Sequence, residues 1–155
     1  VPYMHNATAD GLGRIGVLVG LNSEADVDSL FGLGKQLAMH IAATSPASLS
    51  VDDLDAELVD REREVLIEQA KASGKPQEIA EKMVEGRMNK YYQEVVLLEQ
   101  TSVIDGETRI ADVVSKAGKD AGSDIALSGF VRFNLGEGIE REESDFAAEV
   151  AAQLS

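Results

Sequence analysis

Few residues of the sequence are of a type that could carry out chemistry. It has no cysteine and only two histidines, His5 and His40. The missing thiols exclude disulfides, thiolate nucleophiles and zinc fingers. Neither histidine has the neighbours of a helical metal motif or of a nucleophile triad, so metal and triad chemistry are unsupported. We expect His40, between Met39 and Ile41 on a helix, to pack in the core, and His5, near a strand end, to be exposed.

One stretch of glycines matches a nucleotide-binding pattern. Gly11 to Gly16 read G-x-G-x-x-G, a fingerprint that in dinucleotide-binding proteins follows a strand and opens a helix, so that backbone amides meet the pyrophosphate. Here a period-2 apolar pattern typical of a strand comes next. We therefore interpret the stretch as a loop between two strands, and we expect no directly bound nucleotide and no other cofactor.

Carboxylates are abundant, but their pattern does not indicate catalysis. Asp and Glu number 28 against 14 Lys and Arg, which gives a formal net charge of −14. General acid and base catalysis needs two carboxylates with different environments in one cleft, whereas the acidic residues between 52 and 68 are most simply a solvated helix face. We expect no catalytic residue, and an acidic hydrolase is the least favoured alternative.

The charge and the length also limit the partners and the class of protein. Nucleic acid and anionic membranes bind clustered cations, so neither is expected as a partner, while a basic protein surface would be attracted. No apolar run approaches the roughly 18 residues of a membrane-spanning helix.

The 155 residues suffice for one ordinary domain or two small subdomains. Since the chain starts Val1-Pro2-Tyr3, without an initiator Met or a secretory signal, we expect a fragment of a cytoplasmic protein.

The first elements that position these residues are two strands and a helix. Residues 3–5 are expected to form a short strand, and Ile15, Val17, Val19 and Leu21 alternate along a second one over 14–21. Residues 26–43 have helical spacing, although Gly32 and Gly34 are points where the helix could bend or split. The Ser45-Pro46 pair is expected to end it.

The middle of the chain predicts two long helices joined by a short turn. The first is expected from Ser50, whose hydroxyl can cap it, to Ala72, and the second from Pro76, at its first position, to about Glu99. Gly74 lies between them. Apolar residues of the second helix follow the 4, 3 spacing of a coiled coil, and an antiparallel hairpin of this length would project from the body. These seam residues are Val84, Met88, Tyr91, Val95 and Leu98. Facing them from the first helix are either Leu54, Leu58, Val65 and Ala72 or Leu66 and Ala70.

The last third of the chain returns to the body of the protein. A turn is expected at Asp105-Gly106, followed by a helix capped by Thr108 and ending near Gly118, and another helix from Ser144. Residues 129–135 predict a strand with one buried and one mixed face. Val131, Phe133 and Leu135 lie on one of these faces, and Phe130, Arg132 and Asn134 on the other. The whole predicts an α+β fold: a small antiparallel sheet packed by helices, with a long projecting antiparallel helical hairpin that forms a coiled coil.

Several blocks of sequence resemble a known family in the order in which the family has them. They are Tyr3-Met4-His5, residues 14–19 (Arg-Ile-Gly-Val-Leu-Val), residues 38–43 (Ala-Met-His-Ile-Ala-Ala), the Ser73-Gly74-Lys75-Pro76 tip that leads to Glu-Lys-Met-Val-Glu-Gly-Arg-Met at 81–88, and residues 136–140 and 145–152. The chain is similar over nearly its whole length to bacterial elongation factor Ts, the guanine-nucleotide exchange factor of elongation factor Tu.

The resemblance implies a division of the chain and a function. Residues 1–50 and 100–143 correspond to the family's C-terminal core subdomain, 51–99 to an inserted coiled-coil hairpin and 144–155 to a C-terminal helical module. The family's nucleotide-expelling Thr-Asp-Phe-Val segment has no counterpart, since Ser144-Asp145-Phe146-Ala147 belongs to the terminal helix. The resemblance implies that the chain is a non-enzymatic fragment of the factor, and that its function is to anchor elongation factor Tu, chiefly on its domain 3 side.

The resemblance also points to partner-facing residues. His5 matches a partner-facing histidine of the family. The family's partner-facing Gln-Pro-Phe-Val block reads Gln100-Thr101-Ser102-Val103 here, so Val103, which ends the block, and the next residue, Ile104, are the partner-facing residues that it implies. Phe146 lies in the module that touches the partner's G domain. No metal and no cofactor are implied. The alternative is a self-associating module in which the hairpin seam pairs between chains.

Overall fold

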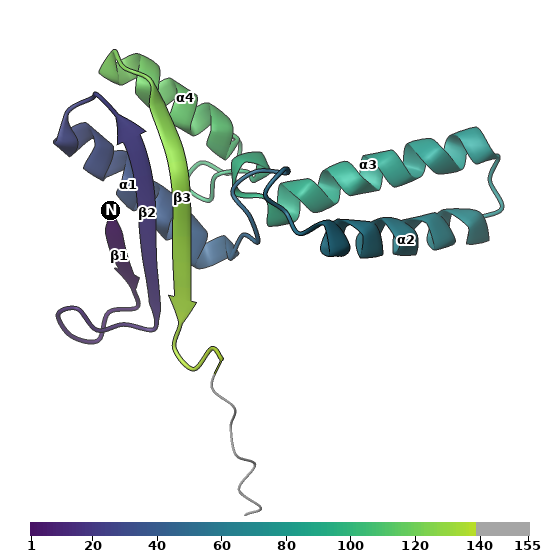
Figure 1. Cartoon of the computed structure of the whole chain (residues 1–155), viewed down its shortest axis with the longest axis horizontal. Helices are drawn as coiled ribbons and strands as arrows, with labels where there is room; N and C mark the ends of the chain where they lie inside the picture. The colour runs from purple at the N-terminus through teal and green to yellow at the C-terminus, as the bar shows by residue number, and fades with distance from the viewer. Residues whose placement is uncertain (139–155) are drawn as a thin grey trace, which may run out of the picture.

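The structure is a computed structural model, and it describes residues 1–138. It combines helices with a small antiparallel sheet of three strands in the order β1-β2-β3 (Figure 1). The elements in chain order are β1 (Pro2–His5), β2 (Ile15–Ser23), α1 (Val27–Thr44), α2 (Ala56–Ala72), α3 (Gln77–Val95), the short 3-10 helix η1 (Leu97–Glu99), α4 (Ile110–Ala121) and β3 (Ile125–Asn134). The helix expected from Ser144, with Phe146, lies outside the described residues.

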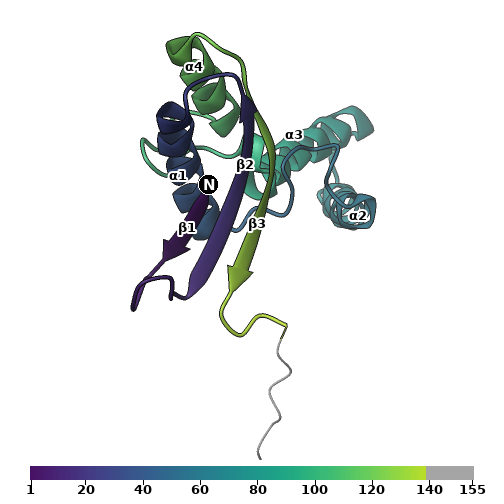
Figure 2. The same cartoon turned by 60° about the vertical axis from the view of Figure 1, so that its left-hand side comes forward.

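The core lies between one face of the sheet and the helices α1 and α4, which both lie on that side of it (Figures 1 and 2). β2 is the central strand and pairs antiparallel with both neighbours. Its alternation is as expected, since Val17 and Val19 are only 4% and 1% exposed. They pack with Leu37 and Ile41 of α1 and with Ile110 of α4.

The expected burial of β3 needs a correction. Val131 and Phe133 are 44% and 72% exposed, while Leu127 and Phe130 pack against the core. Phe130 and Arg132 pair with Val19 and Val17, the buried residues of β2, so their face is the one turned to the core. Leu127, on the other side of Ser128, also packs against the core because the pairing shifts opposite Gly20 and Leu21 and leaves Ser128 as an extra residue in β3. A bulge of one residue reverses which side chains face the core.

The opposite face of the sheet remains uncovered by the described residues. Its exposed side chains are apolar, and with Val131 and Phe133 they include Met4 of β1 and Leu18 of β2, which are 38% and 54% exposed. The residues that line a shallow hollow on this face, among them Pro2, Gly16 and Phe133, carry no charge.

Helix α1 is continuous, so the two glycines do not split it. Asp26 caps its first turn, because its Oδ1 accepts a hydrogen bond from the Ser29 amide at 2.9 Å. Close packing against Val1 explains the glycine at position 34, since a Cβ there would lie 2.5 Å from Cγ2 of Val1. A Cβ on Gly32 would meet open space. The helix ends before Ser45, as expected, and Ser45 takes a left-handed conformation with φ 49°.

Helix α2 begins later than expected. The carboxylate of Asp53 accepts hydrogen bonds from the Ser50 amide at 3.2 Å and the Ser50 hydroxyl at 2.6 Å. These bonds form a turn rather than a helix start, and Asp55 becomes the cap through the Glu57 amide at 2.9 Å. The expected end is confirmed: α2 stops at Ala72, and Gly74 has the positive φ of 66° that favours glycine.

Helix α3 is shorter than expected at its C-terminal end and starts one residue later, with Pro76 as its N-cap. It stops at Val95 because Val96, fully buried, is extended and forms a parallel bridge with Ser48. The Leu97 amide donates to the Ser48 carbonyl at 2.9 Å. Leu98 therefore belongs to η1, and it packs against the main core instead of continuing the seam.

The two helices α2 and α3 lie side by side and extend away from the sheet (Figure 1). Leu66 and Ala70 of α2 pack with Val84 and Met88 of α3 in a buried cluster of their own. Of the alternatives for α2, the pair of Leu66 and Ala70 is correct, because Leu58 and Val65 are 41% and 46% exposed.

Helix α4 starts at Ile110 with Arg109 as its N-cap, so Thr108 does not cap it. It runs past Gly118 to Ala121, because Gly122, with φ 68°, ends it. Among residues 1–138, no helix is long and apolar enough to cross a membrane.

Candidate functional site

The possible metal ligands and the G-x-G-x-x-G stretch are the two features of the described residues that bear on bound ligands. Within residues 1–138 no group of three or more His, Cys, Asp and Glu side chains could hold a metal ion. The glycines of the G-x-G-x-x-G stretch lie in the β1–β2 loop and the start of β2. A strand therefore follows this stretch, as expected, where a dinucleotide site needs a helix.

His5 lies at the end of β1, where it pairs with Ile15 in register. Its ring is half-buried rather than exposed, and its Nδ1 lies 3.0 Å from the Tyr3 hydroxyl. The two rings are tilted by 43° with centroids 5.9 Å apart. Tyr3 therefore orients the His5 ring at the rim of the sheet.

Val103 and Ile104 lie in a tight turn between η1 and α4, and they are 48% and 56% exposed. Asp105 stabilises this turn, because its Oδ1 accepts hydrogen bonds from the amides of Glu107 at 3.1 Å and Thr108 at 3.0 Å. Hydrogen bonds from Thr108 and these amides lower the pKa of Asp105 to about 2. Gly106, with φ 71°, completes the expected Asp-Gly turn. The turn thus presents two apolar side chains on a constrained backbone.

Ile104 also lines a groove of about 620 Å³ between α1 and α4. Leu33 of α1 and Val113 and Ala117 of α4 line the same groove. Polar side chains, among them Gln36, Lys116 and Asp120, line it as well.

A buried polar pair lies directly beneath this turn. His40 is 1% exposed, as its packing role predicts, and burial lowers its pKa. Its Nε2 lies 2.8 Å from Oε1 of Gln100, and its Nδ1 accepts from the Val103 amide at 3.2 Å. Sequence reasoning missed this connection, although a histidine on an apolar helix face signals that a buried partner must exist.

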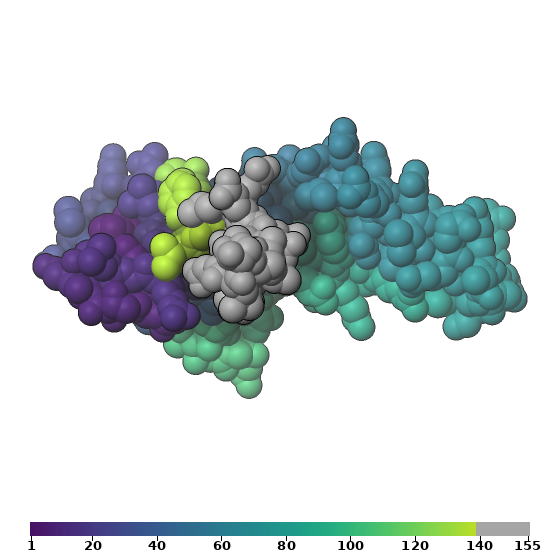
Figure 3. Space-filling model, turned by 90° about the horizontal axis from the view of Figure 1, so that it is seen from below, coloured from purple at the N-terminus to yellow at the C-terminus, as the bar shows by residue number. Residues whose placement is uncertain are grey.

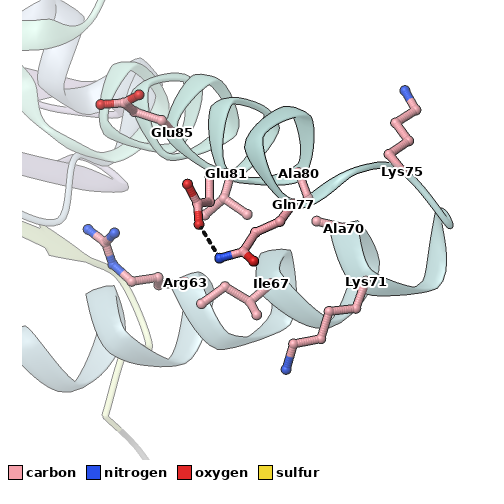
Figure 4. A pocket seen from close by; sticks show the side chains of 10 residues that line it. Arg63, Ile67, Ala70, Lys71, Lys75, Gln77, Ala80, Glu81 and Glu85 are labelled. Atoms are coloured by element: carbon pink, nitrogen blue, oxygen red, sulfur yellow. Dashed lines mark hydrogen bonds between the residues drawn. The ribbon is translucent and has the colours of Figure 1, made fainter.

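A second hollow lies in the hairpin near its tip. It has a volume of about 830 Å³ and is lined by both helices. Figure 4 shows Gln77 and Glu81, which are joined by a hydrogen bond of 2.8 Å, between the helices, and Lys71 and Lys75 extending away from them. Ala70 and Ala80 line the hollow too, and their small side chains leave room between the helices.

The expected site residues do not form one cluster. His5 lies on β1, and its ring bonds to Tyr3 of the same strand. Val103 bonds to His40 of α1, and Ile104 lines the groove between α1 and α4. The loop after β1 and the hairpin tip lie at opposite ends of the molecule (Figure 3). Phe146 lies outside the described residues.

Comparison with known proteins gives one consistent result. The family model "Elongation factor TS" matches residues 1–137. A protein of Rhodospirillum rubrum called elongation factor Ts is 66% identical over 152 residues, which cover 98% of this chain and 49% of that protein. Its namesakes in Erythrobacter litoralis and Rhodospirillum centenum are 61% and 60% identical and cover 99% and 97% of this chain. The chain spans about half the length of these relatives.

Proposed function

The chain belongs to the elongation factor Ts family, and from this premise we propose that it anchors elongation factor Tu as part of a guanine-nucleotide exchange factor. The observation that carries the proposal is the family match over residues 1–137, with 66% identity to a relative of that name. The chain acts as a protein-binding module of the cytoplasm, without catalysing a chemical reaction and without contacting nucleic acid, membrane or nucleotide itself.

The mechanism follows from linkage. A factor that binds the nucleotide-free partner more tightly than the nucleotide-bound partner lowers the affinity for nucleotide by the same coupling factor. The part of the family that carries the Thr-Asp-Phe-Val segment performs the expulsion step. The chain described here contributes anchoring free energy and orientation, chiefly on the domain 3 side of the partner.

The proposed contacts are the 103–104 turn and His5. Support comes from the exposure of Val103 and Ile104, at 48% and 56%, on a turn held by several hydrogen bonds. Apolar side chains presented on a constrained backbone lose little conformational entropy on binding. His5, oriented by Tyr3, and Phe146 of the terminal module complete the proposed set.

The proposed division of the chain follows the family. Residues 1–50 and 100–143 form the C-terminal core subdomain, 51–99 the hairpin and 144–155 the terminal module. We propose that the hairpin is a coiled coil, which is supported by the cluster of Leu66, Ala70, Val84 and Met88 between its two helices. Since the chain itself fills this seam, pairing of the seam between chains is the less favoured alternative.

The proposal is tested by two measurements on one mixture. Elongation factor Tu loaded with fluorescent GDP is titrated with the chain, and binding and GDP dissociation are both followed. We expect saturable binding with a GDP dissociation rate that stays within about twofold of the unassisted rate, because the expelling segment is absent and coupling without it is small. Undetectable binding, or acceleration comparable to that by a full-length factor, contradicts the proposal.

A further inference from the structure

The buried pair of His40 and Gln100 has a single consistent arrangement of protons. The Val103 backbone N–H is a fixed donor, and it points at Nδ1 of His40 at 3.2 Å. Nδ1 must therefore be the unprotonated nitrogen, and Nε2 carries the hydrogen that it donates to Oε1 of Gln100 at 2.8 Å. The surroundings thus select one tautomer of a neutral ring.

The orientation of the Gln100 amide agrees with this tautomer. Its Oε1 also lies 3.1 Å from the Thr44 hydroxyl, whose one hydrogen has a closer acceptor in the His40 carbonyl at 2.9 Å. Its Nε2 donates to the Glu94 carbonyl at 2.7 Å, near the end of α3. The amide oxygen faces the Nε2 hydrogen of His40 and the amide nitrogen faces a backbone carbonyl, so this orientation of the amide agrees with the hydrogen on Nε2.

The backbone of Gln100 extends the connection. Its carbonyl accepts a hydrogen bond from the Ile110 amide at 2.9 Å, at the start of α4. The network therefore connects α1, the last turn of α3, the first turn of α4 and the turn that contains Val103. His40 is the member from a distant part of the sequence, 60 positions from Gln100 and 63 from Val103, and it contacts the turn directly.

We propose that His40 is a positioning residue: its unprotonated Nδ1 holds the 102–106 turn against α1 and so presents Val103 and Ile104 to a protein partner. The inference deepens the proposed function and rests on it for the identity of the partner. A role in packing alone would require only that the site be filled, whereas positioning requires an acceptor at the place of Nδ1.

Two substitutions separate these roles. In His40→Asn the side-chain oxygen takes the place of Nδ1 and can still accept from the Val103 amide, but the bond to Gln100 is lost. In His40→Gln the amide nitrogen takes the place of Nε2 and keeps the bond to Gln100, but the acceptor for Val103 is lost. Both variants place an amide in the same buried site, so each serves as the control of the other.

The primary readout is hydrogen exchange at the Val103 amide, measured by NMR and referred to the core amides of Val19 and Leu37 in the same sample. We expect exchange at Val103 to accelerate about tenfold or more in His40→Gln relative to His40→Asn, because only the former leaves this donor without its partner. Affinity for elongation factor Tu should follow the same order. The loss of affinity caused by His40→Gln should largely vanish in a chain in which Val103 and Ile104 have already been changed to alanine.

Several results would overturn the inference. Equal exchange at Val103 in the two variants would leave only a packing role, and an affinity that does not follow the exchange rate would remove the link to the partner. Nitrogen chemical shifts of the unaltered chain give a test that needs no variant to fold, since a hydrogen on Nδ1 contradicts the proposal. If the unaltered chain does not bind elongation factor Tu, the proposed function fails, while exchange at Val103 still decides whether His40 holds the turn.

Discussion

At the scale of single residues, the structure concentrates its buried polar chemistry around His40. A neutral imidazole in an apolar core would leave its two nitrogens unsatisfied, and such groups cost free energy when they are buried without partners. Gln100 and the Val103 amide supply these partners. His40, which the sequence pattern places in the core, thereby contacts and orders a surface turn.

The protonation of His40 predicts a pH dependence of stability. Burial lowers its pKa below the ordinary value of 6.5. Above that value the ring is neutral in the folded and in the unfolded chain, so His40 causes no change of stability with pH there. As the pH falls below it, the unfolded chain binds more protons than the folded chain, so the free energy of unfolding decreases.

We expect this decrease to be smaller in His40→Asn, which has no titrating group at the site. The check is urea unfolding of the unaltered chain and of His40→Asn at several pH values between 7 and 5, with the urea midpoint of each protein plotted against pH. Parallel midpoint curves for the two proteins would contradict the assignment of the titrating group.

The expected binding residues were only partly accessible from sequence. A resemblance of motifs pointed to Val103 and Ile104, and the structure finds both exposed. The hydrogen bonds that the Glu107 and Thr108 amides donate to the Asp105 carboxylate agree with the expected Asp-Gly turn. The contact between His40 and Val103 spans 63 positions, and no local spacing rule relates residues so far apart.

At the scale of elements, patterns of hydrophobicity predicted the strands and helices, and local hydrogen bonds altered their limits. The sequence indicated β2 and α1 correctly because their apolar periodicity runs along the whole element. It misplaced the start of α2, where Asp53 bonds back to Ser50, and the end of α3, where Val96 pairs with Ser48. Side-chain bonds to nearby backbone and pairing between distant segments are invisible to periodicity.

The bulge in β3 leads to a prediction about two phenylalanines of one strand. Phe130 packs against the core, whereas Phe133 is 72% exposed on the uncovered face. We expect Phe130→Ala to lower the free energy of unfolding by about 2 to 4 kcal/mol and Phe133→Ala by less than about 0.5 kcal/mol. Chemical denaturation measures both. Equal losses, or a larger loss for Phe133, would contradict the bulge.

The glycines of α1 give a second matched pair. A Cβ at Gly32 meets open space, so Gly32→Ala should stabilise the helix by about 1 kcal/mol. A Cβ at Gly34 would lie 2.5 Å from Cγ2 of Val1, so Gly34→Ala must displace the first residue and should destabilise the protein despite the better helix propensity. Urea unfolding decides between them, and stabilisation by both substitutions would show that Val1 does not pack on α1.

At the scale of the whole molecule, the described residues divide into a sheet body and a helical hairpin, each with its own buried cluster. The proposed contact turn lies against the body, and the network of Gln100 connects it to the base of the hairpin. We expect the net charge of −14 to attract a basic protein surface, over a screening distance of roughly 8 Å at physiological salt.

The central claim is that the 103–104 turn anchors elongation factor Tu, and its most direct test is a comparison of two double variants. Val103→Ala with Ile104→Ala alters the proposed contact. Val65→Ala with Ile79→Ala removes the same side chains from the hairpin, where they are 46% and 48% exposed against 48% and 56% in the turn.

The measurement is the dissociation constant for elongation factor Tu, obtained by calorimetry for the unaltered chain and both double variants. The account predicts that the change in the turn weakens binding by about tenfold or more, as expected for two apolar anchors of an interface, while the change in the hairpin leaves it within about twofold. Equal affinities for the two double variants, or a larger loss from the hairpin, would contradict it.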